Sequence, residues 1–203
     1  MAGPTLTTPR LLLRRWHERD LPAFAALNAD SRVTAFLPKP LTRAESDTMV
    51  ERIEGHFDRH GFGLWAVEVV GAAPGNEAAV APGGSPCVGF VGLAVPAFQA
   101  HFTPCVEIGW RLAYENWGRG YAAEAARATL DFAFGQLELD EVVSFTAPAN
   151  RRSWRVMERL GMRRTEADDF QHPALPEGHA LRPHLLHRVR RDQWTQGPGG
   201  PAH

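Results

Sequence analysis

Residues 117–122 read Trp-Gly-Arg-Gly-Tyr-Ala, and they lie between two different apolar patterns. After them, Ala126, Leu130 and Phe134 recur at helical spacing, which predicts a long helix. Before them, residues 106–112 alternate large apolar side chains with Glu, Gly and Arg, which is typical of a strand. The two glycines therefore mark a junction between a strand and a helix.

Gly118 and Gly120 allow two interpretations of this junction. In the first, successive backbone N–H groups converge on a phosphate, and the dipole of the following helix adds a favourable field. A side chain at either position would then stand where a pyrophosphate oxygen lies. In the second, the glycines only make a tight turn. The motif by itself fits both interpretations.

The same kinds of signal predict elements on both sides of this junction. Strands are expected at residues 10–16, 62–70, 88–95, 106–112, 141–147 and 184–190. Helices are expected after Asp20, Thr42, Arg119 and Asn150. Thr42 and Glu45 form a capping box, and Gly61 and Gly161 end two of the helices. Residues 71–87 are dominated by Gly, Ala and Pro, which indicates a flexible loop between two strands.

Length and composition favour a single domain. The chain has 203 residues, 44% of them hydrophobic, which is enough to bury a core. We expect one α/β (α+β) domain over residues 8–194 and a flexible N-terminus over residues 1–7. The tail at residues 195–203, rich in Gly and Pro, is expected to be disordered.

Charge and cysteine content narrow the classes of partner. Acidic and basic residues are mixed along the chain, with a formal net charge of -1, so we expect neither nucleic acid nor a membrane as partner. The sequence shows no signal peptide and no spanning segment, which favours a cytoplasmic protein. Cys87 and Cys105 are too few for a disulfide framework. The histidines lack the accompanying ligands of a zinc site, so no metal is expected.

Three motifs taken together resemble the GNAT superfamily of N-acetyltransferases. They are Val106-Glu107-Ile108-Gly109-Trp110, then Trp117-Gly118-Arg119-Gly120-Tyr121-Ala122-Ala123-Glu124-Ala125, then the stretch from Asn150 to Met162. The opening Thr8-Pro9-Arg10-Leu11-Leu12-Leu13-Arg14 is similar to the branch that contains the bacterial ribosomal-protein N-terminal (alanine/serine) acetyltransferases. The resemblance covers residues 8–194.

The resemblance implies a fold and a cosubstrate. The fold would be a mixed, mostly antiparallel, splayed sheet of seven strands flanked by about four helices, with acetyl-CoA in the gap between the fourth and fifth strands. The backbone of residues 110–112 would pair with the pantetheine arm, and the N–H groups of residues 115–120 would hold the pyrophosphate. The implied acetyl-CoA residues are Trp110, Arg111, Leu112, Asn116, Trp117, Gly118, Arg119, Gly120, Tyr121, Ala122 and Asn150.

Glu115 departs from the family's pattern, because the loop often begins with Gln or Arg. A carboxylate at this place makes a side-chain contribution to phosphate binding doubtful. Arg119, or Arg151 or Arg152 beyond the fifth strand, are the candidates to supply the missing positive charge.

Two residues near the start of the last long helix match functional positions of the family. Asn150 matches its asparagine after the fifth strand, and Ser153 matches the residue that assists the leaving thiol. Both also have structural interpretations. Asn150 is a good N-cap, and Ser153 is small enough for a packed helix face.

Glu107 is the candidate general base, because amine attack on a thioester requires a free lone pair. Strand alternation sets Glu107 on the face opposite the large apolar side chains. Desolvation in a partly dry cleft would raise its pKa toward neutrality, and it is expected to act through a water. The alternative is a structural salt bridge with Arg111, two positions along the same face.

The implied activity is transfer of an acetyl group from acetyl-CoA to a primary amine by direct attack in a ternary complex. The amine would be a protein N-terminus or a small molecule, and loops at residues 32–40 and 168–182 would select it. The enzyme would be a monomer or a homodimer. A non-catalytic CoA-binding module is the alternative if Glu107 and Ser153 are only structural.

A dinucleotide-dependent oxidoreductase is a further alternative. Gly118, Gly120 and Ala123 also fit the G-x-G-x-x-A fingerprint of dinucleotide-binding folds. That fingerprint follows its strand immediately, whereas about five residues separate Leu112 from Gly118. The spacing therefore favours the acetyltransferase.

Overall fold

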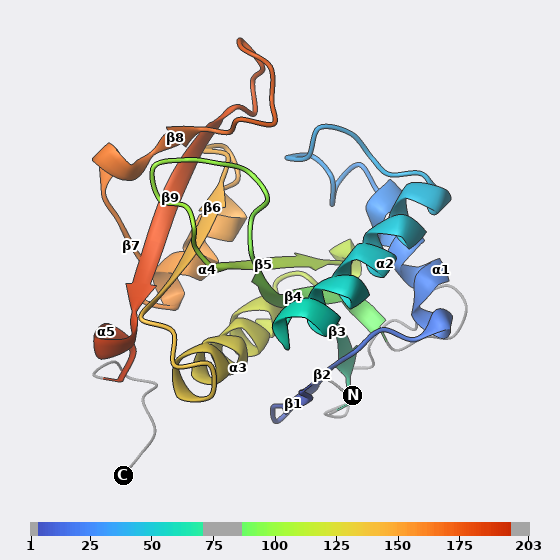
Figure 1. Ribbon diagram of the computed structural model, residues 1–203. Helices are drawn as coiled ribbons and strands as arrows, with labels where there is room; N and C mark the ends of the chain where they lie inside the picture. The colour runs from blue at the N-terminus through green and yellow to red at the C-terminus, as the bar shows by residue number, and fades with distance from the viewer. Residues whose placement is uncertain (1–3, 71–86, 196–203) are drawn as a thin grey trace. The chain divides into compact units, whose positions relative to one another are not determined.

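The computed structural model describes residues 4–70 and 87–195, and Figure 1 gives the labels of the helices and strands. The chain divides into two compact units. The first contains residues 1–94 and 109–129, and the second contains residues 95–108 and 130–203. Strand β5 (Glu107–Leu112) and helix α3 (Tyr121–Gly135) each run from one unit into the other.

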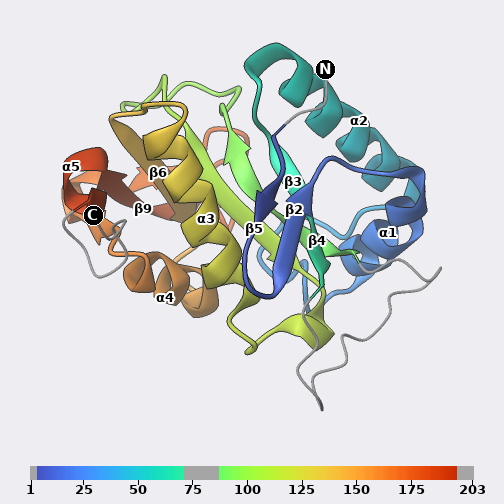
Figure 2. The same cartoon turned by 90° about the horizontal axis from the view of Figure 1, so that it is seen from below.

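Antiparallel strands form the sheet of the first unit. They are β1 (Leu6–Thr7), β2 (Leu11–Arg14), β3 (Leu64–Val69) and β4 (Cys87–Ala94), each paired with the next. Figure 2 shows β2 and β3 side by side. The Ala113 N–H donates to the Val88 carbonyl at 2.9 Å, so the end of β5 lies beside β4 in the sheet. The register shifts between Val67 and Glu68, where β3 opposes β4.

The helices of the first unit begin at the signals that the sequence predicts, and α2 also ends at one. A short 3-10 helix, η1 (Glu18–Asp20), leads into α1 (Leu21–Ala29), and α2 (Arg43–His60) packs against α1. Thr42 and Glu45 form the expected capping box at the start of α2. Gly61 ends α2 with φ 75°, in the left-handed region that glycine tolerates. A second 3-10 helix, η2 (Tyr114–Asn116), precedes α3.

Strand β9 (Pro183–Arg190) organises the second unit. It pairs antiparallel with β6 (Glu141–Thr146), β7 (Arg163–Arg164) and β8 (Phe170–Gln171), and Glu107 pairs in parallel with Val143 of β6. The remaining elements are α4 (Arg151–Arg159), η3 (Glu166–Asp168) and α5 (Arg191–Thr195). A core of Phe102, Val143, Phe170 and Leu186 is buried among them.

The architecture confirms a mixed, mostly antiparallel α/β fold with an open sheet. The described residues contain nine strands and five α-helices, compared with the expected seven strands and about four helices. The elements beyond the six strands and four helices that the residue patterns indicated are too short to give a periodic signal: β1, β7 and β8 have two residues each and α5 has five. Most of the predicted loop at 71–87 and of the predicted tail at 195–203 lies outside the described residues. The exceptions are Cys87, which begins β4, and Thr195, which ends α5.

Candidate active site

The two glycines of the junction are required by the backbone itself. Gly118 has φ 75° and Gly120 has φ 81°, and L side chains rarely adopt such values. An added Cβ at Gly118 would meet nothing within 4 Å, and one at Gly120 would meet only the Arg10 side chain at 3.4 Å. The turn therefore needs glycine, and the space over it is open. First-turn N–H groups of α3 have no intrahelical acceptor, so this end of α3 suits an anion.

Arg10 fixes the start of α3. Its Nη1 donates to the Arg119 carbonyl at 3.0 Å, and its Nε donates to Glu124 Oε2 at 2.7 Å. The guanidinium also lies over the Tyr121 ring, 4.9 Å from the centroid. Burial opposes the charge of Glu124, but hydrogen bonds from Thr8 and Arg10 hold its pKa below the ordinary value. The sequence indicated Arg10 only as part of a family motif and gave no sign of this bracing.

Side chains of the turn preceding α3 contact one another. The Trp117 Nε1 donates to the Leu112 carbonyl at 2.8 Å, and the Trp117 ring lies 5.0 Å from that of Tyr114. Asn116 is buried, and its Oδ1 has no hydrogen-bond partner within the described part of the chain. Ala122 is half-buried in the first turn of α3. The turn thus has a defined shape, with one acceptor atom left over.

Arg32 forms an ion pair with Glu115, the carboxylate that departs from the family's pattern. Its Nη2 lies 3.3 Å from Glu115 Oε1, and its guanidinium lies 4.0 Å from the centroid of the Tyr114 ring. The Nε and Nη2 of the same guanidinium also donate hydrogen bonds to the Asp30 carboxylate. The negative charge of Glu115 is therefore partly balanced by an arginine that sequence reasoning assigned to an acceptor loop.

Of the three alternative candidates for the missing positive charge, Arg119 is half-buried and belongs to the turn itself. Arg151 and Arg152 are exposed on the first turn of α4, in the second unit. The Arg119 carbonyl is the acceptor for Arg10.

Residues 110–112 of β5 differ in their surroundings. Leu112 is buried, whereas Trp110 and Arg111 are half-buried. A Cβ on Gly89 of β4 would lie 2.1 Å from the Arg111 carbonyl, so only glycine permits β4 to approach this closely. The Arg111 Nη1 donates to Asn28 Oδ1 at 2.6 Å, and burial lowers the pKa of Arg111 to about 10.

Glu107 begins β5 and is half-buried. Desolvation raises the pKa of its carboxyl to about 8, the direction that the sequence predicted. No ion pair among the described residues joins it to Arg111, whose side chain bonds to Asn28 instead. The salt-bridge interpretation of Glu107 therefore has no support in the structure.

Asn150 joins β6 to α4 and positions Ser153. Its Oδ1 accepts from the Ser153 N–H at 3.4 Å, so it is the N-cap that the sequence predicted. Its Nδ2 donates to Thr146 Oγ1 at 2.9 Å and to Ser153 Oγ at 3.0 Å. Because the Ser153 oxygen accepts from Asn150, its own hydroxyl proton remains able to donate. The capping and functional interpretations are thus compatible.

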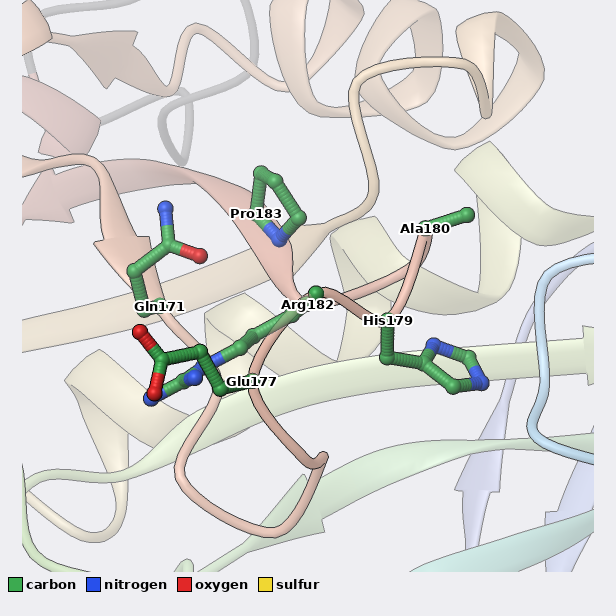
Figure 3. Close-up of a pocket in the computed structure, with 7 residues that line it drawn as sticks. Gln171, Glu177, His179, Ala180, Arg182 and Pro183 are labelled. Atoms are coloured by element: carbon green, nitrogen blue, oxygen red, sulfur yellow. The ribbon is translucent and has the colours of Figure 1, made fainter.

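The segment between β8 and β9 forms an open pocket of about 480 Å³, lined by Gln171, Glu177, Gly178, His179, Ala180, Arg182 and Pro183. Figure 3 shows Gln171, Glu177 and Arg182 on one side of the loop, with His179 pointing away from them. The Arg182 Nε is buried with no hydrogen-bond partner in the described chain. This pocket overlaps the segment at 168–182 that the sequence assigned to acceptor selection.

Neither a cluster of metal ligands nor a membrane-spanning helix occurs in the described residues. Residues 4–70 and 87–194 contain no group of three or more His, Cys, Asp or Glu side chains placed to hold a metal ion. Among the helices of the same residues, none has the length and apolar character needed to span a membrane.

Comparison with known proteins gives the family. The acetyltransferase (GNAT) domain matches residues 10–163, so the chain belongs to the GNAT acetyltransferases. It is 44% identical over 162 residues to YkkB, an uncharacterized protein of Bacillus subtilis (strain 168), covering 79% of this chain and 86% of YkkB.

Solved structures share the fold. A GNAT-family acetyltransferase from Bacillus anthracis is 25% identical with a TM-score of 0.71, over 93% of this chain and 99% of that chain. Mycobacterium smegmatis RimJ in complex with CoA-disulfide is 18% identical with a TM-score of 0.70, over 98% and 91% of the two chains. Ribosomal-protein serine and alanine acetyltransferases from two Vibrio species also share the fold, at 18% and 16% identity with TM-scores of 0.69 and 0.67.

Proposed function

We propose that this protein transfers the acetyl group of acetyl-CoA to a primary amine by direct attack in a ternary complex. The observation that carries the proposal is the carboxyl of Glu107, whose pKa desolvation raises to about 8, within a chain that belongs to the GNAT acetyltransferases. A carboxyl with a pKa near the working pH is suited to accept the proton of an attacking amine.

Acetyl-CoA, when bound, supplies an activated acetyl thioester. The chain's own residues fit its diphosphate, since Gly118 and Gly120 leave open space beside the N-terminus of α3. Arg10 keeps that turn in place through the Arg119 carbonyl. The backbone of residues 110–112 would pair with the pantetheine arm.

Glu107 accepts the proton of the amine, directly or through a water. The carbon–nitrogen bond forms as the carbon–sulfur bond breaks, and the released thiolate needs a hydrogen-bond donor or a proton. Ser153 donates that hydrogen bond, because Asn150 holds its oxygen as an acceptor. A serine hydroxyl is much less acidic than a thiol, so Ser153 stabilises the sulfur rather than protonating it.

The acceptor is a primary amine, either a protein N-terminus or a small molecule. Two loops would select it. One follows α1 and includes Arg32, and the other is the segment at 168–182 with its pocket.

A turnover experiment tests the proposal. Release of free thiol from acetyl-CoA is measured with peptides that have free N-termini, polyamines, amino acids and aminoglycosides, and the acetylated product is identified by mass spectrometry. Thiol release that depends on one class of amine supports the proposal. Acetyl-CoA binding with no turnover of any amine would favour the non-catalytic CoA-binding module.

Gly120→Val tests the phosphate turn separately. The variant should lose acetyl-CoA affinity, since valine is strained at φ 81° and a side chain would occupy the space over the turn. Its fold is checked by circular dichroism. A folded variant that binds acetyl-CoA as tightly as the parent would show that the phosphate lies elsewhere.

A further inference from the structure

The guanidinium of Arg111 lies among neutral side chains of the first unit. Its Nη1 contacts Asn28 Oδ1 at 2.6 Å and the Met49 sulfur at 3.9 Å, and the guanidinium lies 5.4 Å from the centroid of the Phe90 ring. None of these three groups is anionic. Within residues 4–70 and 87–194, no carboxylate forms an ion pair with Arg111.

Two fully buried polar residues hold this guanidinium in place. Asn28 of α1 and Ser46 of α2 are both 0% exposed. The Asn28 Nδ2 donates to Ser46 Oγ at 2.9 Å, which fixes the amide so that its Oδ1 faces Arg111. Buried polar groups of this kind are retained where they are hydrogen-bonded. Here the bonded pair positions an arginine.

Part of the Arg111 guanidinium remains available to a ligand. Arginine has five N–H donors, and the contacts of the described residues use Nη1. The other nitrogens are not among the fully buried atoms that lack a partner, so they reach open space. Burial also lowers the pKa of Arg111. A desolvated cation without a counter-ion is unfavourable, and an anion at its open side would relieve this.

We propose that Arg111 binds a carboxylate of the acceptor, so that the acceptor is an amine that also carries a carboxylate. This inference rests on the proposed function. A carboxylate fits because its single charge matches one guanidinium and its two oxygens match the N–H fork. The acceptor is the ligand expected here, because Asn28 and Met49 belong to α1 and α2. The segment that joins these two helices is the loop assigned to acceptor selection.

Matched acceptors test the proposal. An amino acid and its carboxamide differ in the carboxylate, and kcat/KM is expressed per unprotonated amine because the carboxylate raises the amine pKa. In the parent enzyme, kcat/KM should favour the carboxylate by about ten- to a hundredfold, the usual range for hydrogen bonds to a charged group. In Arg111→Met this ratio should fall to about one. A folded Arg111→Met enzyme that keeps the parent's ratio would overturn the proposal.

Asn28→Asp provides a second variant that does not remove the arginine. Its carboxylate would lie against Arg111 Nη1 and act as a counter-ion. The variant should therefore have a raised Tm and a reduced preference for the carboxylate acceptor. This result decides the question if Arg111→Met does not fold. An unchanged preference together with a raised Tm would show that the Arg111 charge does not bind acceptor.

Equilibrium binding separates failure of this inference from failure of the proposed function. The corresponding N-acetyl amino acid is titrated into the parent and into Asn28→Asp, with CoA present, by calorimetry. Tighter binding to the parent supports the carboxylate site even if no amine is turned over. Equal binding to both proteins would overturn the carboxylate site, and amine turnover would then still support the acetyltransferase.

Discussion

Arg14 and Arg111 are both desolvated arginines of the first unit, but Arg14 is paired with carboxylates and Arg111 has neutral neighbours. Arg14 donates to Asp20 through Nη1 and Nη2, at 2.6 and 3.0 Å, and to Glu68 through Nε at 2.8 Å. Burial opposes its charge, but these two carboxylates hold its pKa above the ordinary value. Arg111 has an amide, a sulfur and a ring as neighbours, and its pKa is lowered.

The difference separates a structural arginine from one that is available to a ligand. The Arg14 group links η1, β2 and β3 with its charges paired, so it has little to offer a ligand. Strand β5 carries both Arg111 and Glu107, and desolvation shifts the pKa of each, with no ion pair to either side chain among the described residues. Shifted pKa values of this kind cluster at functional sites.

The largest effect is expected from Glu107→Gln. Glutamine keeps the size of the side chain but cannot accept a proton, so kcat should fall by about 10²–10⁴. The affinity for acetyl-CoA, measured by calorimetry, should stay near that of the parent. A variant with the parent's kcat would remove Glu107 from the mechanism.

Stability provides a control on Glu107 that does not use activity. A carboxyl whose pKa is about 8 in the folded state and 4.5 ordinarily binds more protons when folded, so its contribution to stability is lost as the pH rises from about 4.5 to about 8. The Tm of Glu107→Gln minus the Tm of the parent should therefore increase as the pH rises across this range. A constant difference would show that the carboxyl is not desolvated.

Asp20→Asn is expected to have the largest effect on stability. It leaves the buried guanidinium of Arg14 with Glu68 as its remaining carboxylate among the contacts described here. Removing one partner of a buried pair typically costs about 3–5 kcal/mol, and Glu68 should keep the loss near the lower end. Urea unfolding measures it. A loss below about 1 kcal/mol would mean that the contrast with Arg111 has no energetic basis.

Ser153→Ala should have a smaller effect on the rate. The lost hydrogen bond to the departing sulfur is worth about 1–2 kcal/mol, or roughly ten- to thirtyfold in kcat. Single-turnover kinetics establish whether thiol release is limiting. If release is limiting and the rate is unchanged, the Ser153 hydroxyl only helps to hold the Asn150 side chain.

Glu115→Gln should change least. The residue is exposed and its charge is partly balanced by Arg32, and exposed pairs contribute about 0–1 kcal/mol. Acetyl-CoA affinity should be equal to that of the parent or slightly higher, because a carboxylate repels a diphosphate. A large loss of affinity in calorimetry would reveal an unrecognised role for Glu115.

Local signals explain what the sequence predicted of the fold. The capping box at Thr42, the glycine at 61 and the cap at Asn150 are read from neighbouring residues, and the structure confirms all three. Strands β7 and β8 have two residues each and exist because they pair with β9. Pairing with a strand distant in sequence leaves no periodic pattern in so short a segment.

The candidate site shows the same limit. The turn at Gly118 and Gly120 was recognisable because glycine is tied to its backbone geometry. The contacts of Arg10 and Arg111 were not recognisable, since their partners Glu124 and Asn28 lie 114 and 83 residues away. Whether the charge of an arginine is paired with a carboxylate depends on such contacts, and these cannot be predicted from composition.

The pH dependence of kcat/KM tests most directly whether β5 supplies the general base. An acceptor with an alkyl amine is chosen, because its pKa of about 10.4 is well separated from the value of about 8 for Glu107. In the parent, the slope of log kcat/KM against pH should fall from about two to about one near pH 8, because both groups must be deprotonated below it. In Glu107→Gln the slope should be about one throughout. The same profile in both enzymes, with no change of slope near pH 8, would contradict the assignment.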